Sequence, residues 1–312
     1  MTAPVLFLST VFKPDIWLSS LKSLSPGLAI QVWPDADVTP EAVRYAVVWR
    51  PPHGVLRTFP NLACVFSLGA GVDAIVSDPD YPRHVPLSRM IDPTLTQAMT
   101  EYVVLHVLYN HRRQRDFEAL QRLRKWRALN APRAEQVRVG IMGLGVLGTD
   151  AAQKLVPLGY QLSGWSMTRK HVPGVRSFCG QPELPAFLAQ TDILVCLLPL
   201  TPETQGILNR SVLSQLPKGA SLINAARGAH MVPEDVLALL DEGLLSGATL
   251  DVFPEEPLPP ESQFWTHPKV TLTPHAAAAT DPRAISRHIV ETIAAMERGG
   301  APGNLVDLSK GY

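Results

Sequence analysis

The sequence predicts an α/β fold with two doubly wound parallel-sheet domains, and three observations lead to this prediction. Short apolar segments of strand length alternate with longer amphipathic or irregular segments along the chain. One of these apolar segments runs directly into a glycine-rich turn and a helix-spaced apolar pattern. The length of 312 residues favours two domains, and 46% hydrophobic against 18% charged residues supplies material for packed cores.

The first hundred residues predict a small parallel α/β unit. Turn-forming residues follow each of its apolar segments, which is the pattern of strands joined by crossover connections. The predicted strands are 4–9, 30–33, 46–49, 64–67 and 86–88.

Two of these strands are followed by unusual residues. Trp49 and Arg50 come at the end of the third strand, and a turn that contains Ala70 and Gly71 follows the fourth. Ligands bind beyond the carboxyl ends of strands in open parallel sheets, and the bare N–H groups of this turn form a nest able to hold a carboxylate. Both loops are therefore candidate walls of a binding site, with ordinary βα turns as the alternative.

A long amphipathic helix is predicted from about Met99 to Arg122, and we expect it to connect the two domains. His106 and His111 lie five positions apart on it, so they do not share a face as metal ligands, and no metal site is predicted. Beyond the helix, Trp126 lies on a projecting polar segment. It is expected to contact a second subunit, with a solvent-exposed arm as the alternative.

The central motif of the chain is G-L-G-V-L-G, which follows the apolar segment 137–142. Gly143 makes a tight turn, Gly145 lets the main chain approach a pyrophosphate, and Gly148 lets the next helix pack close to the strand. This order of strand, turn and helix predicts a dinucleotide site. A glycine-rich turn without a ligand is the alternative.

The first turn of the helix predicted at 146–156 completes this dinucleotide site. Its free backbone N–H groups, which include those of Val146 and Leu147, are expected to face the phosphates of the cofactor. The helix dipole favours negative charge at the same place.

The strand predicted at 161–165 ends where a dinucleotide-binding sheet usually carries an acidic residue for the ribose hydroxyls. This chain has Ser166 there, followed by Arg169 and Lys170, and it has no carboxylate that would repel a 2′-phosphate. The sequence therefore predicts NADP as the cofactor, with NAD less preferred. A basic pair on the surface is the alternative.

Four further buried strands follow, at 192–198, 221–225, 248–252 and 270–273. A helix is predicted to begin at Glu203 and Thr204, after the first of these strands. Residues near the strand ends that a cofactor or substrate could contact are Leu198, Pro199, Ala225, Ala226, Arg227, Asp251, Glu256 and His275. Because carboxyl ends of parallel strands share one edge of a sheet, the charged members of this set form a candidate catalytic constellation.

Composition excludes several classes of partner. The 28 basic residues balance the 28 acidic ones, so net charge draws the chain to neither nucleic acid nor an anionic membrane. The longest apolar run, 193–198, is too short to span a bilayer, and the N-terminal residues lack the basic region of a signal peptide. Three widely separated cysteines predict no disulfide framework, so we expect a cytoplasmic protein.

The motifs taken together resemble one enzyme family. The chain carries, in this order, G-L-G-V-L-G, N-A-A-R-G, L-D-V-F-P-E-E-P-L-P and T-P-H, which is similar to the D-isomer-specific 2-hydroxyacid dehydrogenase family over nearly the whole length. Within it, S-L-G-A-G-V-D, V-W-R-P-P, the pair Arg169-Lys170 and the C-terminal G-Y resemble the bacterial glyoxylate/hydroxypyruvate reductase A branch. The resemblance implies NADPH-dependent reduction of small 2-oxo acids, with glyoxylate giving glycolate and hydroxypyruvate giving D-glycerate.

The resemblance also implies a domain organisation. Residues 1–98 and 280–312 would form a substrate-binding domain, and residues 99–279 an NADP-binding Rossmann domain. In the family the cleft lies between the two domains, and closure on the ligand is expected. A homodimer is expected as well.

Reduction of a 2-oxo acid suggests roles for the charged residues. Arg227 offers forked donors that bind the substrate carboxylate and polarise the ketone. His275 donates the proton to the carbonyl oxygen, because imidazole has the side-chain pKa nearest neutrality. In the family, Glu256 orients this histidine and favours its protonated form, and Asp251 holds the carboxamide of the nicotinamide.

Residues of the first domain would complete the substrate site. The N–H groups of Ala70 and Gly71 would hold the other edge of the carboxylate, and Trp49 and Arg50 would close a pocket for a short, polar 2-oxo acid. Two other functions stay open on the sequence alone. One is a dehydrogenase for a bulkier D-2-hydroxy acid, and the other is a non-enzymatic interaction protein that senses NAD(P).

Overall fold

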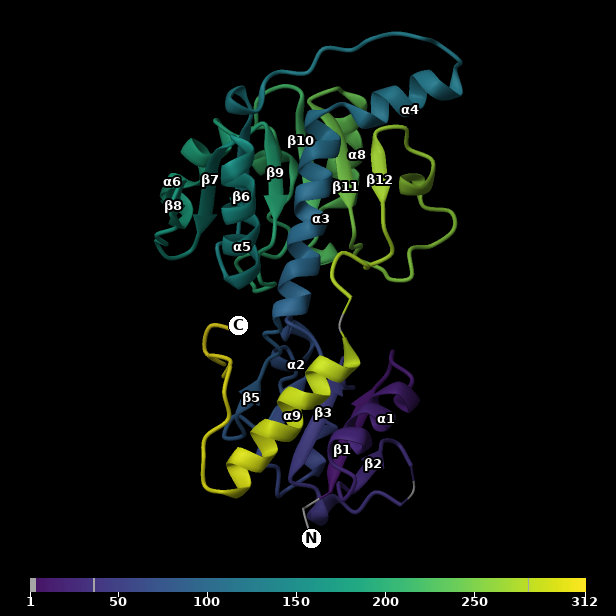
Figure 1. Cartoon of the computed structure of the whole chain (residues 1–312), viewed down its shortest axis with the longest axis vertical. Helices are drawn as coiled ribbons and strands as arrows, with labels where there is room; N and C mark the ends of the chain where they lie inside the picture. The colour runs from purple at the N-terminus through teal and green to yellow at the C-terminus, as the bar shows by residue number, and fades with distance from the viewer. Residues whose placement is uncertain (1–3, 36, 280) are drawn as a thin grey trace. The chain divides into compact units, whose positions relative to one another are not determined.

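The computed structural model describes residues 4–35, 37–279 and 281–312, and these residues form two compact units (Figure 1). The first unit contains the described residues of Met1–Leu95 and Thr280–Tyr312, and the second is Thr96–Ala279. Each unit is built on a parallel β-sheet flanked by helices, which confirms the predicted α/β fold class.

The sheet of the first unit has the strand order β2-β1-β3-β4-β5, and all of its pairings are parallel. Its strands are β1 (Val5–Ser9), β2 (Ile30–Val32), β3 (Tyr45–Trp49), β4 (Cys64–Ser67) and β5 (Leu87–Ser88). Its helices are α1 (Pro14–Leu24), η1 (Pro40–Ala42), η2 (Leu56–Thr58), α2 (Asp73–Val76) and α9 (Pro282–Glu297). This strand order is that of flavodoxin-like sheets, which place ligands at the carboxyl ends of the strands.

Both faces of this first sheet are covered. Side chains of β1 alternate between two buried clusters, since Leu6 packs in one and Phe7 in the other. The C-terminal helix α9 adds Ile285, Ile289 and Ile293 to the cluster that contains Phe7. Their spacing of four residues puts all three on one face of the helix, so the last helix of the chain belongs to the core of the first unit.

The sheet of the second unit has the order β12-β11-β10-β9-β6-β7-β8, and its pairings are also parallel. Its strands are β6 (Arg138–Met142), β7 (Gln161–Ser166), β8 (Val175–Cys179), β9 (Ile193–Cys196), β10 (Ala220–Asn224), β11 (Leu245–Leu250) and β12 (Val270–Leu272). The strand order reverses between β6 and β9, as in Rossmann sheets. Such a reversal is the point where a dinucleotide binds.

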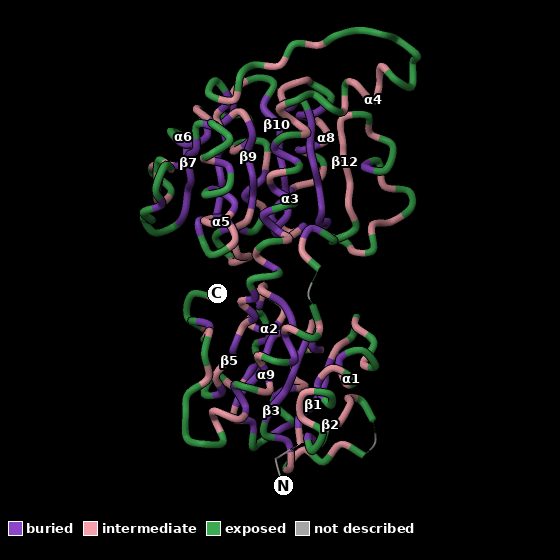
Figure 2. Tube along the Cα trace, viewed as in Figure 1, coloured by how far each residue is buried: buried purple, intermediate pink, exposed green. Residues whose placement is uncertain are grey.

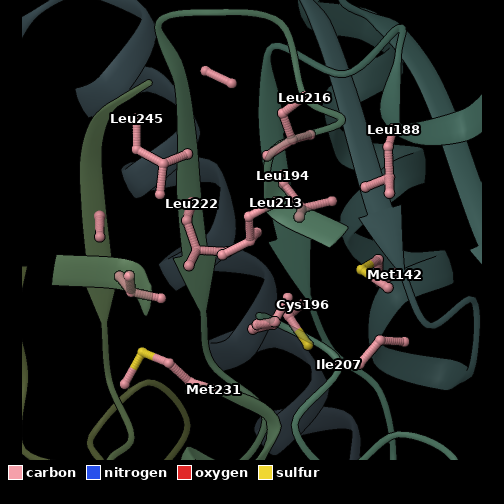
Figure 3. Packing of buried hydrophobic residues seen from close by; sticks show 14 of the residues in the cluster. Met142, Leu188, Leu194, Cys196, Ile207, Leu213, Leu216, Leu222, Met231 and Leu245 are labelled. Carbon is pink, nitrogen blue, oxygen red and sulfur yellow. The ribbon is translucent and has the colours of Figure 1, made fainter. Parts of the chain in front are cut away.

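Helices cover both faces of this second sheet as well. They are α3 (Pro93–His111), which begins in the first unit, then α4 (Gln114–Arg122), η3 (Ala134–Gln136), α5 (Val146–Leu155), η4 (Val156–Leu158), α6 (Gly180–Leu188), α7 (Arg210–Leu213), η5 (Gly228–His230), α8 (Pro233–Asp241) and η6 (Gln263–Trp265). Leu194 of β9 lies in the core of one face (Figure 3), and Val195 in the core of the other. The central strands of both sheets are buried, whereas β2, β8 and β12 at the sheet edges are mostly only partly buried (Figure 2). None of the described helices combines the length and the apolarity needed to cross a membrane.

Three predictions about elements need correction. Strand β8 was not predicted, because its sequence V-R-S-F-C alternates polar and apolar residues at a sheet edge and has no apolar run. The helix expected from Glu203 is wrong, since residues 202–206 form turns in which the Thr204 hydroxyl bonds to the carbonyl oxygen of Pro199 at 2.7 Å. The long central helix divides into α3 and α4 at Arg113, which adopts a left-handed φ of 57°.

Candidate active site

The turn between β6 and α5 requires two of its glycines for steric reasons. Gly143 has a φ of +104°, and a Cβ on it would lie 2.6 Å from the carbonyl oxygen of Leu197. A Cβ on Gly148 would lie 1.9 Å from the carbonyl oxygen of Gly143, so only glycine lets α5 pack this close to β6. A Cβ on Gly145 would meet no described atom within 4 Å, so the main chain there borders open space. This open, side-chain-free turn at a helix N-terminus fits the pyrophosphate of a dinucleotide.

The last residue of β7 and the loop after it contain the residues predicted to select NADP. Ser166 is buried, and its hydroxyl accepts a hydrogen bond from the Leu144 N–H at 3.1 Å, so it supports the glycine turn. Arg169 and Lys170 are exposed. The Arg169 guanidinium donates to the carbonyl oxygen of Ser177 at 2.9 Å and pairs with Glu183 of α6. The pairing with Glu183 was not predicted from the sequence.

The predicted catalytic residues follow neighbouring strands of the second sheet. His275 comes after β12, Asp251 directly after β11 and Arg227 after β10, and these three strands are adjacent in the sheet. Glu256 lies in the connection between β11 and β12. Because the strands are parallel, the structure brings all four residues to the carboxyl edge of one sheet, as the sequence predicted.

His275 and Glu256 are in direct contact. The imidazole Nδ1 lies 2.8 Å from Glu256 Oε2, and Glu256 Oε1 accepts the Phe253 N–H at 3.0 Å. The histidine side chain is 36% exposed and the carboxylate 18% exposed. In the described part of the chain, no hydrogen-bond partner occupies Nε2 of His275, so this nitrogen is available to a ligand.

The Arg227 turn lies against the loop that carries Glu256. A Cβ on Gly228, the next residue, would lie 1.8 Å from the carbonyl carbon of Phe253, so this close approach requires glycine. The Phe253 N–H in turn binds Glu256. Arg227 itself is half-buried, and its Nη1 donates to the carbonyl oxygen of Ala226 at 2.8 Å.

A buried histidine holds the Arg227 turn to the loop after β9. His230 is fully buried, and its Nδ1 accepts the Arg227 N–H at 3.2 Å. Its Nδ1 also lies 3.1 Å from the carbonyl oxygen of Arg227, and its Nε2 lies 3.2 Å from the carbonyl oxygen of Pro199. The hydrogen bonds of His230 were not predicted from the sequence, although a histidine inside the apolar stretch that leads into α8 is a signal that could have indicated them.

Asp251 is nearly inaccessible to solvent, with 1% exposure, and it holds the His275 loop. Its Oδ1 accepts the Thr273 hydroxyl at 2.6 Å and the Ala276 N–H at 2.8 Å, and its Oδ2 accepts the Ala277 N–H at 3.0 Å. The predicted contact with a nicotinamide carboxamide stays a prediction. So do the cofactor contacts predicted for Leu198, Pro199, Ala225 and Ala226, of which Leu198 and the two alanines are buried.

The other predicted substrate residues belong to the first unit. The Trp49 ring stacks on Phe12, with ring centroids 5.8 Å apart and planes at 29°. It also covers Gly69, where a Cβ would lie 2.3 Å from Trp49 Cζ3. Arg50 is exposed with a left-handed φ of 46°, and its carbonyl oxygen accepts the Thr10 hydroxyl at 3.0 Å.

Three loops therefore meet at the carboxyl edge of the first sheet, after β1, β3 and β4. In the loop after β4, Ala70 and Gly71 are half-buried, and the Ser67 hydroxyl donates to the carbonyl oxygens of Gly69 at 3.0 Å and of Gly71 at 3.3 Å. The contribution of Phe12 was missed by sequence reasoning. An aromatic residue three positions beyond the end of a predicted strand could have signalled it.

The charged and polar residues described do not form a metal centre. Among residues 4–35, 37–279 and 281–312, no group of three or more His, Cys, Asp or Glu side chains could hold a metal ion.

Comparisons with known proteins support the family resemblance. Residues 104–277 match the model of the D-isomer specific 2-hydroxyacid dehydrogenase NAD binding domain. The chain is 44% identical to glyoxylate/hydroxypyruvate reductase A of Yersinia enterocolitica, over 99% of both chains. A D-isomer specific 2-hydroxyacid dehydrogenase of Xanthobacter autotrophicus Py2, solved with NADPH and MES, is 42% identical with a TM-score of 0.94 over 100% of both chains.

A second solved structure is similarly close. The NADPH-dependent glyoxylate/hydroxypyruvate reductase of Sinorhizobium meliloti, in complex with NADP and sulfate, is 42% identical with a TM-score of 0.93, over 99% of this chain and 100% of that one. The match to the family model covers more than half of the chain, and the identities extend over nearly all of it. The chain belongs to the D-isomer specific 2-hydroxyacid dehydrogenase family.

Proposed function

We propose that this protein reduces small 2-oxo acids with NADPH, converting glyoxylate to glycolate and hydroxypyruvate to D-glycerate. The observation that carries the proposal is the His275–Glu256 pair, at 2.8 Å, on the same sheet edge as the Arg227 turn and the open glycine turn. Relatives at 43–44% identity over nearly the whole chain are glyoxylate/hydroxypyruvate reductases, and similar solved structures hold NADPH or NADP.

The second unit is proposed to be the NADP-binding domain. The N–H groups at the start of α5 would bind the pyrophosphate, and Arg169 and Lys170 would bind the 2′-phosphate. Asp251, Leu198, Pro199, Ala225 and Ala226 would contact the remainder of the cofactor. Bound NADPH supplies the hydride, and the protein supplies binding, orientation and the proton.

The first unit is proposed to be the substrate-binding domain. Its N–H groups at Ala70 and Gly71 would bind an edge of the substrate carboxylate, and Trp49 and Arg50 would limit the pocket to short, polar acids. Arg227, which belongs to the second unit, would bind a substrate carboxylate through its planar fork of donors and polarise the carbonyl group. The Phe12 ring supports this role for Trp49, since it holds the indole from one side.

His275 is proposed to be the proton donor. Its Nδ1 binds Glu256, which leaves the Nε2 proton to be transferred to the carbonyl oxygen of the substrate. Glu256 stabilises the positive charge of the protonated ring and fixes its orientation. The Phe253 N–H and the backbone of Asp251 hold the two partners in place.

An NADPH-oxidation assay tests the proposed function. The purified chain is mixed with NADPH and, in separate reactions, with glyoxylate, hydroxypyruvate, pyruvate and phenylpyruvate, and the absorbance of NADPH is followed. The proposal expects the highest kcat/KM for glyoxylate and hydroxypyruvate. A preference for phenylpyruvate would instead indicate a dehydrogenase for bulkier D-2-hydroxy acids, and cofactor binding without oxidation would indicate an NAD(P)-sensing protein.

Arg169→Asp is expected to change the cofactor preference. The substitution removes a cation from the proposed 2′-phosphate site and adds a charge that repels the phosphate, so the KM for NADPH should rise by about 10-fold or more relative to that for NADH. Steady-state kinetics with both cofactors measures this ratio. Arg176→Asp is the matched control. Arg176 lies on β8, the strand after the Arg169 loop, and its guanidinium donates to the Gln190 side chain. An unchanged ratio in Arg169→Asp contradicts the phosphate role.

We propose that the protein is a homodimer formed through the second unit. Leu105 and Leu108 of α3 are 58% and 37% exposed, and Trp126 is fully exposed on the long loop after α4 (Figure 1). Aromatic residues are enriched at protein interfaces, so Trp126 is proposed to contact the second subunit. A cytoplasmic location is also proposed, because Cys64, Cys179 and Cys196 are all free thiols.

Trp126→Ala is expected to weaken the dimer. Loss of a large aromatic anchor at an interface commonly costs about 2 kcal/mol or more of binding free energy, which raises the dissociation constant by roughly 30-fold. Sedimentation velocity over a concentration series measures the change. Trp265→Ala is the control, since Trp265 is 51% exposed but lies in η6, where its indole N–H binds Pro259. A wild-type chain that sediments as a monomer at all concentrations overturns the dimer.

A further inference from the structure

A chain of hydrogen bonds leads from helix α3 to the loop that carries His275. The Tyr102 hydroxyl lies 2.8 Å from Thr273 Oγ1, and Thr273 Oγ1 donates to Asp251 Oδ1 at 2.6 Å. A threonine hydroxyl has one proton, and here it is given to the carboxylate. The Tyr102 hydroxyl must therefore donate to Thr273, so that the chain runs in one direction, from the phenol to Asp251.

Asp251 connects this chain of hydrogen bonds to the backbone of His275 and the residues after it. Its backbone carbonyl accepts the His275 N–H at 2.8 Å, and its carboxylate accepts the N–H groups of Ala276 and Ala277. His275 adopts a left-handed φ of 51°, which is uncommon for a residue with a side chain. The hydrogen bonds of Asp251 hold the loop in this conformation.

The position of β12 explains why this loop needs support from a helix. Among the described strands, β12 is at the edge of its sheet and pairs with β11 alone. Thr271 of β12 and Thr273, the first residue after this strand, both bind side chains from outside the sheet. The Arg115 guanidinium donates to Thr271 at 3.0 Å, and the Tyr102 hydroxyl donates to Thr273.

The Tyr102 hydroxyl stays protonated in its surroundings and can therefore donate a hydrogen bond. Tyr102 is 8% exposed, and burial raises the pKa of its hydroxyl above the ordinary range, so the group stays protonated. The His106 ring packs on the Tyr102 ring, with the ring centroids 4.2 Å apart. Burial lowers the pKa of His106 to about 4. The imidazole is therefore neutral near pH 7 and places no competing cation beside Asp251.

We propose that Tyr102 is a positioning residue for the reaction, acting through Thr273 and Asp251 to hold His275 against Glu256. The proposal rests on the proposed function, in which His275 donates the proton. Tyr102 itself does not touch a reacting atom. Its hydroxyl anchors the end of the edge strand, and the imidazole takes its orientation from that anchor.

Tyr102→Phe tests the proposal, because it keeps the ring and removes only the hydroxyl. We expect kcat for glyoxylate to fall by about 10-fold, because the free energy of one buried hydrogen bond, added to the activation barrier, changes the rate by about this factor. The dissociation constant for NADPH should stay within about 2-fold, since the glycine turn is untouched. Tyr160→Phe is the matched control. It removes a buried hydroxyl from the same unit, where Tyr160 binds His111 Nδ1 at 2.8 Å, and should leave kcat unchanged.

Thr273 supplies a second, independent test. Thr273→Val removes the hydroxyl while keeping the shape of the side chain, and Thr273→Ser keeps the hydroxyl. We expect a loss of kcat in the valine variant and recovery in the serine variant. The double variant Tyr102→Phe with Thr273→Val should be no slower than Thr273→Val alone, because both changes break one chain. Additive losses, or a kcat of Tyr102→Phe equal to that of the wild type, overturn the proposal.

Hydrogen exchange separates this proposal from the proposed function. In the chain without ligands, Tyr102→Phe should speed exchange of the Ala276 and Ala277 amides by about 10-fold, while Tyr160→Phe should not. Failure of the wild-type chain to oxidise NADPH with any 2-oxo acid overturns the function, but the exchange measurement still decides whether Tyr102 holds this loop. Unchanged exchange together with an active wild type overturns the positioning role alone.

Discussion

His275→Ala is expected to reduce kcat for glyoxylate and hydroxypyruvate by about 10²- to 10⁴-fold, the range that a positioned general acid contributes. The imidazole Nδ1 binds Glu256 at 2.8 Å, so the substitution removes both the proton and the group that Glu256 orients. No hydrogen bond joins His275 to the glycine turn in the described structure, and NADPH binding should remain within a few-fold of the wild type. Single-turnover kinetics and fluorescence titration with NADPH measure the two effects separately.

A matched histidine control makes this result specific. His84 is exposed in the first unit and plays no part in the proposed reaction, so His84→Ala should retain full activity. Full activity in His275→Ala would remove His275 as the proton donor. Equal losses of kcat and of NADPH affinity would instead indicate that the substitution disturbs the fold.

Arg227→Lys is expected to lower kcat/KM for glyoxylate by about 10³-fold, which corresponds to about 4 kcal/mol. Lysine keeps the positive charge but has no planar fork, so it cannot form two parallel hydrogen bonds with a carboxylate or polarise the ketone at the same time. The backbone of the turn is held by His230 and by the contact of Gly228 with Phe253, so the substitution should not displace it. Kinetics over a range of glyoxylate concentrations measures the loss.

Arg210→Lys is the control for a general loss of an arginine. Arg210 is exposed and pairs with Glu242 at 2.8 Å in the same unit, and it is not among the proposed substrate or cofactor contacts. It should retain wild-type kinetics, because exposed ion pairs contribute little. Wild-type kcat/KM in Arg227→Lys would show that the guanidinium does not bind the substrate carboxylate.

Elements with a strong local pattern could be predicted from the sequence, and weakly patterned ones could not. The apolar run before Gly143 and the glycine spacing after it were sufficient to predict β6, the turn and α5. Strand β8 was missed because an edge strand with one exposed face has little apolar signal. The helix expected from Glu203 was wrong because the Thr204 hydroxyl binds nearby backbone instead, and that competition depends on where Pro199 lies.

The same distinction holds for the candidate site. Arg227, Asp251 and His275 could be named because each follows a recognisable strand, and the parallel order of the strands brings them to one edge. The contacts of Tyr102 with Thr273 and of His230 with Pro199 could not be predicted, because these partners are 171 and 31 positions away in the chain. Tyr102 and His230 both lie in segments whose local pattern is apolar. Only the tertiary contacts show that their polar atoms bind residues of the site.

The amino-acid sequence by itself determined the fold class, the glycine turn and the identity of the charged groups at the strand ends. These features depend on periodicity and backbone sterics within a few residues, which are present in the chain before it folds. Only the tertiary structure decided that His275 meets Glu256, that Trp49 covers Gly69 beside Phe12, and that Tyr102 reaches Asp251 through Thr273. Hydrogen bonds and ring contacts have short range, so they depend on which distant segments the folded core brings within a few ångströms of each other.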